Sequence, residues 1–496
     1  MNYQGGGGGG LSYSATIGPS SSTSSASGFS SFFAGKRKKP KSNIGKTNST
    51  FVAKITTNEN LAKILANRVN EDVYLFWNTG RTFTWSDLGQ KPNEPLSHIS
   101  FSKAFPTAHD VNILTRSCDH LDVIIGFSTG DIIWFNPLSN KYSRLNKQAI
   151  IKDSAVTTIK WLPGSESQFM VAFQDGSIVM MDKDKDDNAF TTPTPPDEYR
   201  YRPILFLSLL FTSHLLYKYP KSFHATKPKH GRHNPISHWH ISRKPINAFA
   251  FSPDLQHVAV VAADGELRII DFRNERLIET FTSYFGALSC VCWSPDGKYI
   301  LTGGQDDLVT IWSFKDLRIV ARCQGHQNYV TGVAFDSWRC DERNYRFGSV
   351  GEDAKLLLWD FSVGSLHKPK AQQHQHSLST MFHHPNACNS RKSEEAGGVT
   401  PTATTAATGL RGSVDAEREG EHPVAMARPP ERRSRVAMLQ PLMATAIHHE
   451  PLASITFRED AILTSDRRGH IKVWKRPARP AASSVSGSGG GGGSHS

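Results

Sequence analysis

Short runs of alternating apolar and polar residues recur along the chain, and a turn containing aspartate precedes each of them. Four copies share one spacing, in which the aspartate stands six positions before a large apolar residue. They run from Asp175 to Met181, from Asp264 to Ile270, from Asp306 to Trp312 and from Asp353 to Trp359. Alternation predicts strands with one buried face, and aspartate is typical of turns because its carboxylate binds backbone amides.

The copies repeat at intervals close to the length of one supersecondary unit. The large residues are 47 positions apart from Trp134 to Met181, 42 from Ile270 to Trp312, and 47 from Trp312 to Trp359. A four-stranded propeller blade takes ~40–45 residues, so each copy indicates one blade. A second marker, a strand that ends in a tight turn, lies upstream in each blade; Trp293-Ser-Pro-Asp-Gly297 is an example. Two longer intervals each contain a blade and an insertion.

Six blades are visible in this pattern, and the last ends at Trp474. The segment Phe51–Leu88 carries further strands ahead of them. We therefore predict an all-β protein, a WD40 β-propeller of seven blades with disordered tails and insertions. The N-terminal strands are expected to close the ring beside the Trp474 blade, which leaves no exposed sheet edges.

One blade carries the complete WD40 signature in four polar and aromatic residues. They are His326, Ser349, Asp353 and Trp359. In WD40 blades, side chains at these positions form a hydrogen-bond chain, and a fully paired buried chain makes the blade rigid. We therefore interpret His326 as a structural histidine. The other blades lack this histidine, and the last has Arg468 where the aspartate is expected.

The composition divides the chain into five segments. Residues 1–50 are Gly/Ser-rich and then basic, and residues 478–496 form a similar tail. Such segments bury too little apolar surface to offset the entropy of ordering, so we predict them to be disordered. Propeller blades occupy 51–365, with an irregular insertion at about 187–235. A disordered insertion fills 366–445, and the last blade takes 446–477.

The apolar run Ile204–Leu216 does not fit the repeat pattern. It spans 13 residues, whereas a membrane helix needs ~20. It could be a core strand with a loop, an amphipathic anchor, or an artefact of gene prediction such as a translated intron. We favour the artefact, because the run interrupts a region that otherwise resembles a polar linker.

The formal net charge of +12 makes nucleic acid or an acidic protein a candidate partner. Much of the excess lies in two blocks, Lys36–Lys41 and Arg428–Arg435, in segments predicted to be unfolded. A solvated tail is the simpler interpretation of both, and a nuclear-import signal is the alternative for Lys36–Lys41. The predicted strands carry no regular basic and aromatic pattern for stacking bases, which disfavours nucleic acid.

The cysteines and the N-terminus indicate a reducing compartment. Six cysteines are scattered over 496 residues, too sparsely for a disulfide framework. Cys290 and Cys292 lie on one strand, but no second pair with zinc spacing follows. The N-terminus has no charged-then-apolar signal peptide. We expect a cytoplasmic protein, with the nucleus as a further location.

A search for catalytic chemistry yields no candidates. The sequence lacks a phosphate-binding P-loop, a His-Glu-x-x-His zinc motif and a Gly-x-Ser-x-Gly elbow. The pairs His383-His384 and His448-His449 are adjacent rather than at ligand spacing, and we interpret them as surface residues. We predict no catalytic residues, no metal and no cofactor, and hence no enzyme, no small-molecule substrate and no membrane partner.

Several longer runs carry a more specific resemblance. They include Gly126-Phe-Ser-Thr-Gly-Asp-Ile-Ile-Trp134, Phe249-Ala-Phe-Ser-Pro-Asp-Leu255, Cys290-Val-Cys-Trp-Ser-Pro-Asp-Gly-Lys-Tyr299 and Thr302-Gly-Gly-Gln-Asp-Asp-Leu308. Over about Phe51–Asp360, and again at Ile462–Pro477, the chain resembles the fungal catabolite-repression WD40 protein CreC and its animal relatives. Ile204–Leu216 and Leu366–Thr445 depart from the family pattern.

The resemblance implies a non-enzymatic scaffold. CreC-type proteins bind a ubiquitin-specific protease, the CreB-type deubiquitinating enzyme, and protect it from proteolysis. The pair acts in the ubiquitination network that controls carbon source utilisation. The alternative is a generic WD40 adaptor, such as a ubiquitin-ligase substrate receptor or a chromatin-associated reader. A ligase receptor would need an adaptor-docking segment, and none is clear in this sequence.

Three aromatic residues are the candidates for partner contact. Tyr284 and Phe285 precede Gly286, and Tyr329 follows His326, at points where loops enter two blades. Members of the family that the chain resembles carry aromatic residues at both points. Aromatic anchors dominate protein-binding hot spots. The alternative is that these side chains pack against a neighbouring blade.

Overall fold

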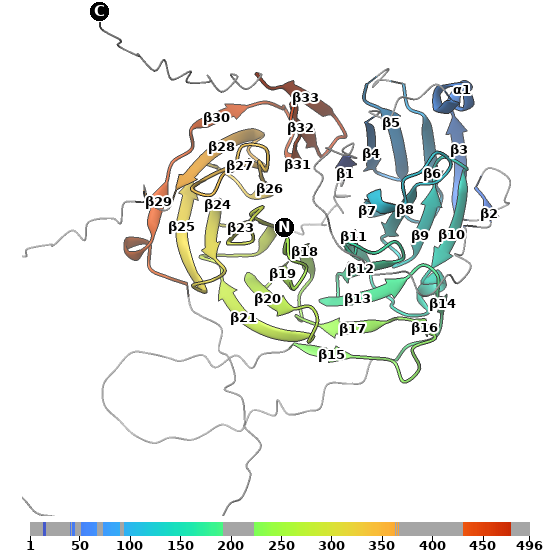
Figure 1. Ribbon diagram of the computed structural model, residues 1–496, viewed down its shortest axis with the longest axis horizontal. Helices are drawn as coiled ribbons and strands as arrows, with labels where there is room; N and C mark the ends of the chain where they lie inside the picture. The colour runs from blue at the N-terminus through green and yellow to red at the C-terminus, as the bar shows by residue number, and fades with distance from the viewer. Residues whose placement is uncertain are drawn as a thin grey trace, which may run out of the picture. The chain divides into compact units, whose positions relative to one another are not determined.

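A computed structural model of the chain describes residues 13–15, 40, 42–44, 51–66, 73–89, 94–191, 223–362, 364, 366 and 430–477. The chain divides into two compact units, 1–369 with 425–496 and 370–424, and every described residue belongs to the first. In this unit seven sheets follow one another around a common axis (Figure 1). The predicted seven-bladed β-propeller is therefore confirmed.

The first three blades are five-stranded sheets in which strands from distant parts of the sequence pair. Blade 1 consists of β1 (Tyr13–Ala15), β4 (Tyr74–Thr79), β5 (Thr82–Asp87), β6 (Ser97–Phe101) and β3 (Val52–Thr57). Blade 2 consists of β7 (Pro106–Asn112), β8 (Asp122–Phe127), β9 (Ile132–Asn136), β10 (Lys141–Leu145) and β2 (Ser42–Asn43). Blade 3 consists of β11 (Val156–Trp161), β12 (Gln168–Phe173), β13 (Ser177–Asp182), β17 (Ser237–His240) and β15 (His224–Thr226).

In blades 4 and 7 the strands follow one another in sequence order, whereas the outermost strands of blades 5 and 6 come from residues 437–446. Blade 4 consists of β18 (Ile246–Phe251), β19 (His257–Ala262), β20 (Glu266–Asp271) and β21 (Arg276–Thr282). Blade 5 consists of β22 (Leu288–Trp293), β23 (Tyr299–Gly304), β24 (Leu308–Ser313), β25 (Arg318–Gln324) and β29 (Ala437–Leu439). Blade 6 consists of β26 (Val330–Phe335), β27 (Asn344–Gly351), β28 (Lys355–Ser362) and β30 (Met443–Ala446), and blade 7 of β31 (Leu452–Phe457), β32 (Ala461–Asp466) and β33 (Ile471–Lys475).

Polar side chains on the inner strands join blade 3 to blade 4, blade 4 to blade 5 and blade 6 to blade 7. The hydroxyl of Thr158 donates to the carbonyl of Asn247 at 3.0 Å, and the Asn247 amide donates to Leu288 at 2.6 Å. Thr331 donates in the same way to Leu452 at 2.7 Å. These bonds satisfy inner-strand carbonyls that face the neighbouring blade, where an unpaired group would be costly.

The core lies between blades, because each sheet buries both faces against its neighbours. In blade 2, Ile124 and Trp134 pack in one cluster with Phe169 and Val171 of blade 3. The ring closes in the same way: Leu75 of β4 packs against Leu463 of β32. The N-terminal strands therefore lie beside the blade that ends at Trp474.

The expected insertions at 187–235 and 366–445 are corrected by the structure. Each lies inside a blade, between the third strand and the fourth, and its returning end forms strands. In blade 3 that end supplies β15, and β16 (His233–Asn234) pairs with β14 (Asp186–Asp187). In the second insertion it supplies β29 and β30. These strands have only two to four residues, and all four of β30 are exposed, so they lack the apolar alternation that sequence analysis needs.

The N-terminal boundary at residue 50 also requires correction. β2 adds to the outer edge of blade 2 by pairing with β10, and the adjacent Ile44 is buried. Residues 430–435 of the basic block Arg428–Arg435 are likewise structured, since the backbone carbonyl of Glu431 accepts a bond from Arg322. The block Lys36–Lys41, apart from Pro40, and the run Ile204–Leu216 lie outside the described residues.

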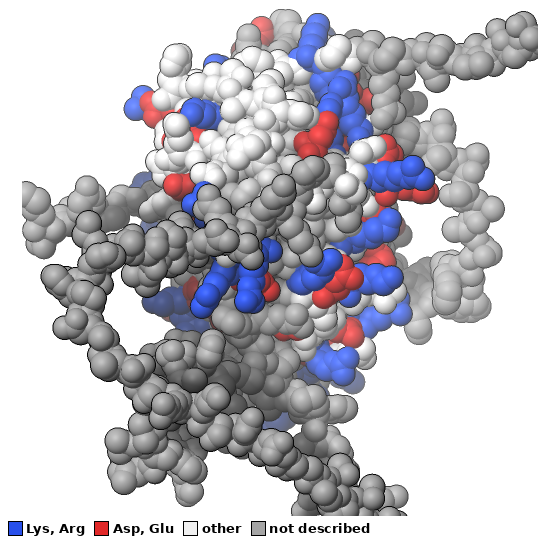
Figure 2. All heavy atoms as spheres, turned by 90° about the vertical axis from the view of Figure 1, so that its left-hand side faces the viewer, with Lys and Arg blue, Asp and Glu red and all other residues white. Residues whose placement is uncertain are grey.

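Antiparallel strands alternate in direction, so the connecting loops divide between two faces. The loops from second to third strand, and from each outer strand to the next blade, form what we call the upper face. The other loops form the lower face. On the side shown in Figure 2, lysine and arginine alternate with aspartate and glutamate rather than forming one basic surface. Within the described ranges, the one short α-helix, α1 (Leu61–Ala66), included, no helix is long and apolar enough to cross a membrane.

Candidate partner-binding face

The three aromatic residues expected to touch a partner all lie on the upper face. Tyr284 and Phe285 stand in the loop between β21 and β22, and Tyr329 stands between β25 and β26. Their exposed fractions are 48%, 72% and 42%. With 72% of Phe285 exposed, its ring is not buried against a neighbouring blade. The two loops enter consecutive blades on the upper face, and we call the three exposed residues Tyr284, Phe285 and Tyr329 the aromatic patch.

Short hydrogen bonds hold the Phe285 loop between the turns of two blades. The Ser283 amide donates to the carbonyl of Gly265 at 2.8 Å, and the Ser283 hydroxyl donates to the carbonyl of Gly286 at 2.8 Å. On the other side, the Ala287 amide donates to the side-chain oxygen of Gln305 at 3.1 Å. A loop fixed at both ends loses little further entropy on binding, which favours its use as a contact surface.

Beneath the patch, Tyr284 covers a buried arginine. The Arg322 guanidinium lies 4.6 Å from the centre of the Tyr284 ring, and one of its nitrogens donates to the carbonyl of Glu431 at 2.7 Å. Burial lowers the pKa of Arg322, while Tyr284 and Asp306 oppose that shift. Burial raises the pKa of Asp306 to about 6, although the Leu308 amide donates to its carboxylate. Arg322 was not predicted at this face because a single basic residue on a strand carries no local signal, and Asp306 was predicted only as a turn residue of the repeat.

Tyr329 lies beside the hydrogen-bond chain of its own blade, and its carbonyl accepts a bond from the Glu352 amide at 2.8 Å. The Trp359 indole donates to the Ser349 hydroxyl at 2.9 Å, and Ser349 lies 2.8 Å from Nε2 of His326. Nδ1 of His326 is 3.1 Å from the carboxylate of Asp353. Burial tends to raise the pKa of Asp353, but hydrogen bonds from His326 and the Gln327 amide outweigh it, so this pKa is lowered. The four predicted residues are therefore in contact, and the His326 ring has no free nitrogen for catalysis.

A second chain of this kind lies in blade 7, and it overturns two interpretations from the sequence. The indole of Trp474 donates to the Thr464 hydroxyl at 3.0 Å, and Thr464 lies 3.0 Å from His448. The other nitrogen of His448 is 3.0 Å from Asp466. His448 is therefore a buried structural residue, not a surface one. Asp466, rather than the residue at the Arg468 position, supplies the carboxylate.

The shift of the aspartate explains why the sequence pattern missed this chain. In both blades the hydroxyl residue stands ten positions before the tryptophan, Ser349 before Trp359 and Thr464 before Trp474. The aspartate of blade 7 stands at the end of its strand instead of in the turn, two positions earlier than in blade 6. A search that allowed this offset, together with an upstream histidine, would have found it.

The described residues contain neither a cluster of metal ligands nor a buried thiol of lowered pKa. No group of three His, Cys, Asp or Glu side chains within them could hold a metal ion. The five described cysteines are free, and burial raises the pKa of the Cys290 thiol to about 12. A thiol that remains protonated is a poor nucleophile. The upper face instead presents exposed side chains on loops that hydrogen bonds hold in place.

The fold and this face define a WD40 β-propeller protein. The family model described as "WD domain, G-beta repeat" matches residues 234–271 and 275–313, from β16 to β24. The chain is also 36% identical over 433 residues to the UBP9-binding protein bun62 of Schizosaccharomyces pombe, a match that covers 86% of this chain and 75% of that protein. The chain belongs to the family of WD40 proteins that includes bun62, consistent with the CreC-type resemblance.

Proposed function

We propose that this protein is a non-enzymatic scaffold that binds and stabilises a CreB-type deubiquitinating enzyme, a ubiquitin-specific protease. The observation that carries the proposal is the aromatic patch on the upper face, with Phe285 at 72% exposure on a loop held at both ends. A relative that binds UBP9 supports the same class of partner. The role in carbon catabolite repression, in the cytoplasm and the nucleus, is part of this proposal.

The stabilising effect follows from mass action. A scaffold that binds only the folded protease shifts the protease population toward the folded form and away from forms open to proteolysis. No covalent step on the scaffold is needed. The scaffold contributes rigid loops, and the binding energy is concentrated in the few aromatic side chains that a partner pocket can bury.

The test is a binding titration of the full chain against a CreB-type protease, with Phe285→Ala plus Tyr329→Ala as the variant. Truncation of a hot-spot anchor costs about 2 kcal/mol or more, so the double variant should bind roughly a thousandfold more weakly. The matched control is Ile113→Ala plus Leu114→Ala, which removes side chains of 53% and 56% exposure from the lower face. This control should bind like the wild type.

Two results would contradict the proposal. If the folded wild-type chain does not bind the protease, the scaffold function fails, and a generic WD40 adaptor becomes the better description. If the control loses as much affinity as the aromatic variant, the binding face is wrong. A protease degradation assay, with and without the scaffold, then checks whether binding slows proteolysis.

A further inference from the structure

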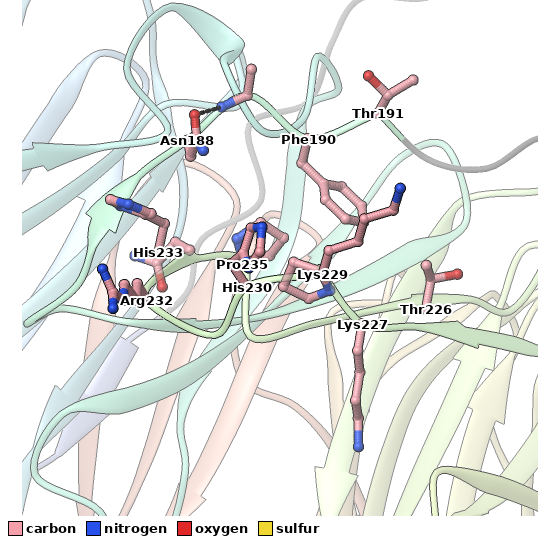
Figure 3. Close-up of a pocket in the computed structure, with 13 residues that line it drawn as sticks. Asn188, Phe190, Thr191, Thr226, Lys227, Lys229, His230, Arg232, His233 and Pro235 are labelled. Carbon is pink, nitrogen blue, oxygen red and sulfur yellow. Dashed lines mark hydrogen bonds between the residues drawn. The ribbon is translucent and has the colours of Figure 1, made fainter.

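A basic pocket lies on the lower-face side of blade 3, in the long connection between β13 and β17. It has a volume of about 770 Å³, and thirteen residues from two stretches, 188–191 and 226–235, line it (Figure 3). A cavity of this size is in the range that holds a ligand much larger than a single inorganic ion. Neither the WD40 signature nor the aromatic patch accounts for it.

The charge of the lining has one sign. Lys227, Lys229, His230, Arg232 and His233 all line the pocket, and none of the thirteen lining residues is aspartate or glutamate. Lys227 forms an ion pair of 3.2 Å with Glu275 of blade 4. Within the part of the chain that the structure describes, no carboxylate forms an ion pair with Lys229 or Arg232. Basic side chains gathered on a lining that contains no carboxylate favour the binding of an anion.

The backbone that carries these residues is held in place before any ligand binds. The buried side chain of Asn234 accepts a bond from the Asp182 amide at 2.8 Å and donates to the Asp182 carbonyl at 2.9 Å. It also donates to the carboxylate of Asp187 at 3.0 Å. The Lys185 ammonium donates to the carbonyl of Gly231 at 2.8 Å. The pocket therefore does not need to be ordered by its ligand, which lowers the entropic cost of binding.

Part of the wall is apolar. Phe190 lines the pocket and its ring lies 5.7 Å from the ring of His238, and Ala189, Pro228 and Pro235 line it as well. An apolar wall beside basic side chains suits a peptide that alternates acidic and apolar residues. Binding of a single-stranded nucleic acid would need several aromatic platforms, and Phe190 is the one aromatic ring among Phe, Tyr and Trp in this lining.

We infer that this pocket binds an acidic peptide segment of a partner protein, through the ammonium of Lys229 and the guanidinium of Arg232. Arginine is suited to this task because its planar group binds a carboxylate through two parallel hydrogen bonds. The pocket belongs to the third-to-fourth strand connection, so it is on the face opposite to Phe285 and Tyr329. The inference stands independently of the proposed protease partner, and both faces can be occupied together.

The experiment is fluorescence anisotropy of the full chain with a labelled short peptide of alternating glutamate and phenylalanine. The variant is Lys229→Glu plus Arg232→Glu. The matched control is Lys315→Glu plus Arg318→Glu, which makes the same charge change at two exposed lower-face residues, one in the turn after β24 and one at the start of β25. The wild type and the control should bind the peptide, and the pocket variant should bind about tenfold more weakly or worse. Added salt should weaken wild-type binding.

Further arms decide whether the pocket is specific. A peptide with glutamine in place of glutamate should not bind, and neither inorganic phosphate nor a single-stranded oligonucleotide should displace the acidic peptide. The inference is overturned if the wild type fails to bind, if the glutamine peptide binds equally, if the control loses as much affinity, or if the oligonucleotide competes. Unfolding curves check that the variant is folded, and Lys229→Gln plus Arg232→Gln replaces it if it is not.

Discussion

The guanidinium of Arg322 lies 4.6 Å from the centre of the Tyr284 ring, so an exposed aromatic residue on the upper face covers a buried cation. The ring faces the cation on one side and solvent on the other, with 48% of Tyr284 exposed. Arg322 belongs to β25 and Tyr284 to the loop before β22, so the contact joins the loop that enters blade 5 to the fourth strand of that blade. A cation–π contact with Arg322 thus stabilises the observed orientation of the Tyr284 ring.

Two variants of Tyr284 should distinguish the contribution of its ring from that of its hydroxyl. Tyr284→Ala removes a cation–π contact of about 0.5–2 kcal/mol, and we expect it to reduce both stability and protease binding. Tyr284→Phe keeps the ring over Arg322 and should do neither. Thermal unfolding and a binding titration of both variants test this. Equal losses in the two variants would mean that the hydroxyl, not the ring, makes the contact.

Gly265 should control the loop that presents Phe285. This glycine has φ +80, and a Cβ added there would meet the Gly286 carbonyl at 2.4 Å. Gly265→Ala is therefore expected to displace the loop and weaken protease binding by about tenfold or more. The control is Gly164→Ala, at φ +81, where the nearest atom is a Leu255 carbon at 3.9 Å.

Because both glycine variants carry the same backbone strain, only the contact differs between them. Gly164→Ala should lower the stability by about 1 kcal/mol and leave binding unchanged. Binding and unfolding are measured for each. A Gly265→Ala protein that bound normally would show that the Phe285 loop does not depend on the neighbouring turn.

The adjacent histidines of blade 7 should behave differently. His448→Ala removes one hydrogen-bond partner each from the buried side chains of Asp466 and Thr464, so we expect a loss of about 1–3 kcal/mol in the free energy of unfolding. His449→Ala changes an exposed residue and should stay within about 0.5 kcal/mol of the wild type. Chemical denaturation of both variants measures the difference. Similar losses of unfolding free energy in the two variants would contradict a structural role for His448.

The same histidine predicts a pH dependence. Burial lowers the pKa of His448 below 6.5, although Asp466 raises it. A folded-state pKa below the unfolded value means that the unfolded chain binds more protons, so this stability is present above pH 6.5 and is lost as the pH falls through the folded pKa. His448→Ala should reduce the loss of stability over that window.

The raised pKa of Asp306 predicts a pH dependence of stability with the opposite sign. Burial raises the pKa of Asp306 from 3.8 to about 6, so the folded state binds the proton more tightly and its ionised form is unfavourable. Above pH 6, Asp306→Asn should stabilise the protein by on the order of 1 kcal/mol, after allowance for solvent screening. The gain should disappear below pH 3.8. Exposed Asp153 provides the control Asp153→Asn, and a pH-independent gain would contradict the assignment.

The repeat pattern was sufficient to predict the propeller architecture and one of the two hydrogen-bond chains, the chain that begins at Trp359. Strand alternation and the turn aspartates are local signals, read over a few residues, and they predicted the blades from Trp134 to Trp359 and the order of the ring. The chain from Trp359 to Asp353 was predictable for the same reason, since all of its members occupy the usual positions.

What the tertiary structure decided is which distant segments meet. The sequence shows neither that the insertions open inside blades 3 and 6 nor that β29 pairs in parallel with β25. It also does not assemble the pocket around Lys229 and Arg232. Local patterns record which face of a strand is buried, whereas pairing between segments far apart depends on packing that no short window contains.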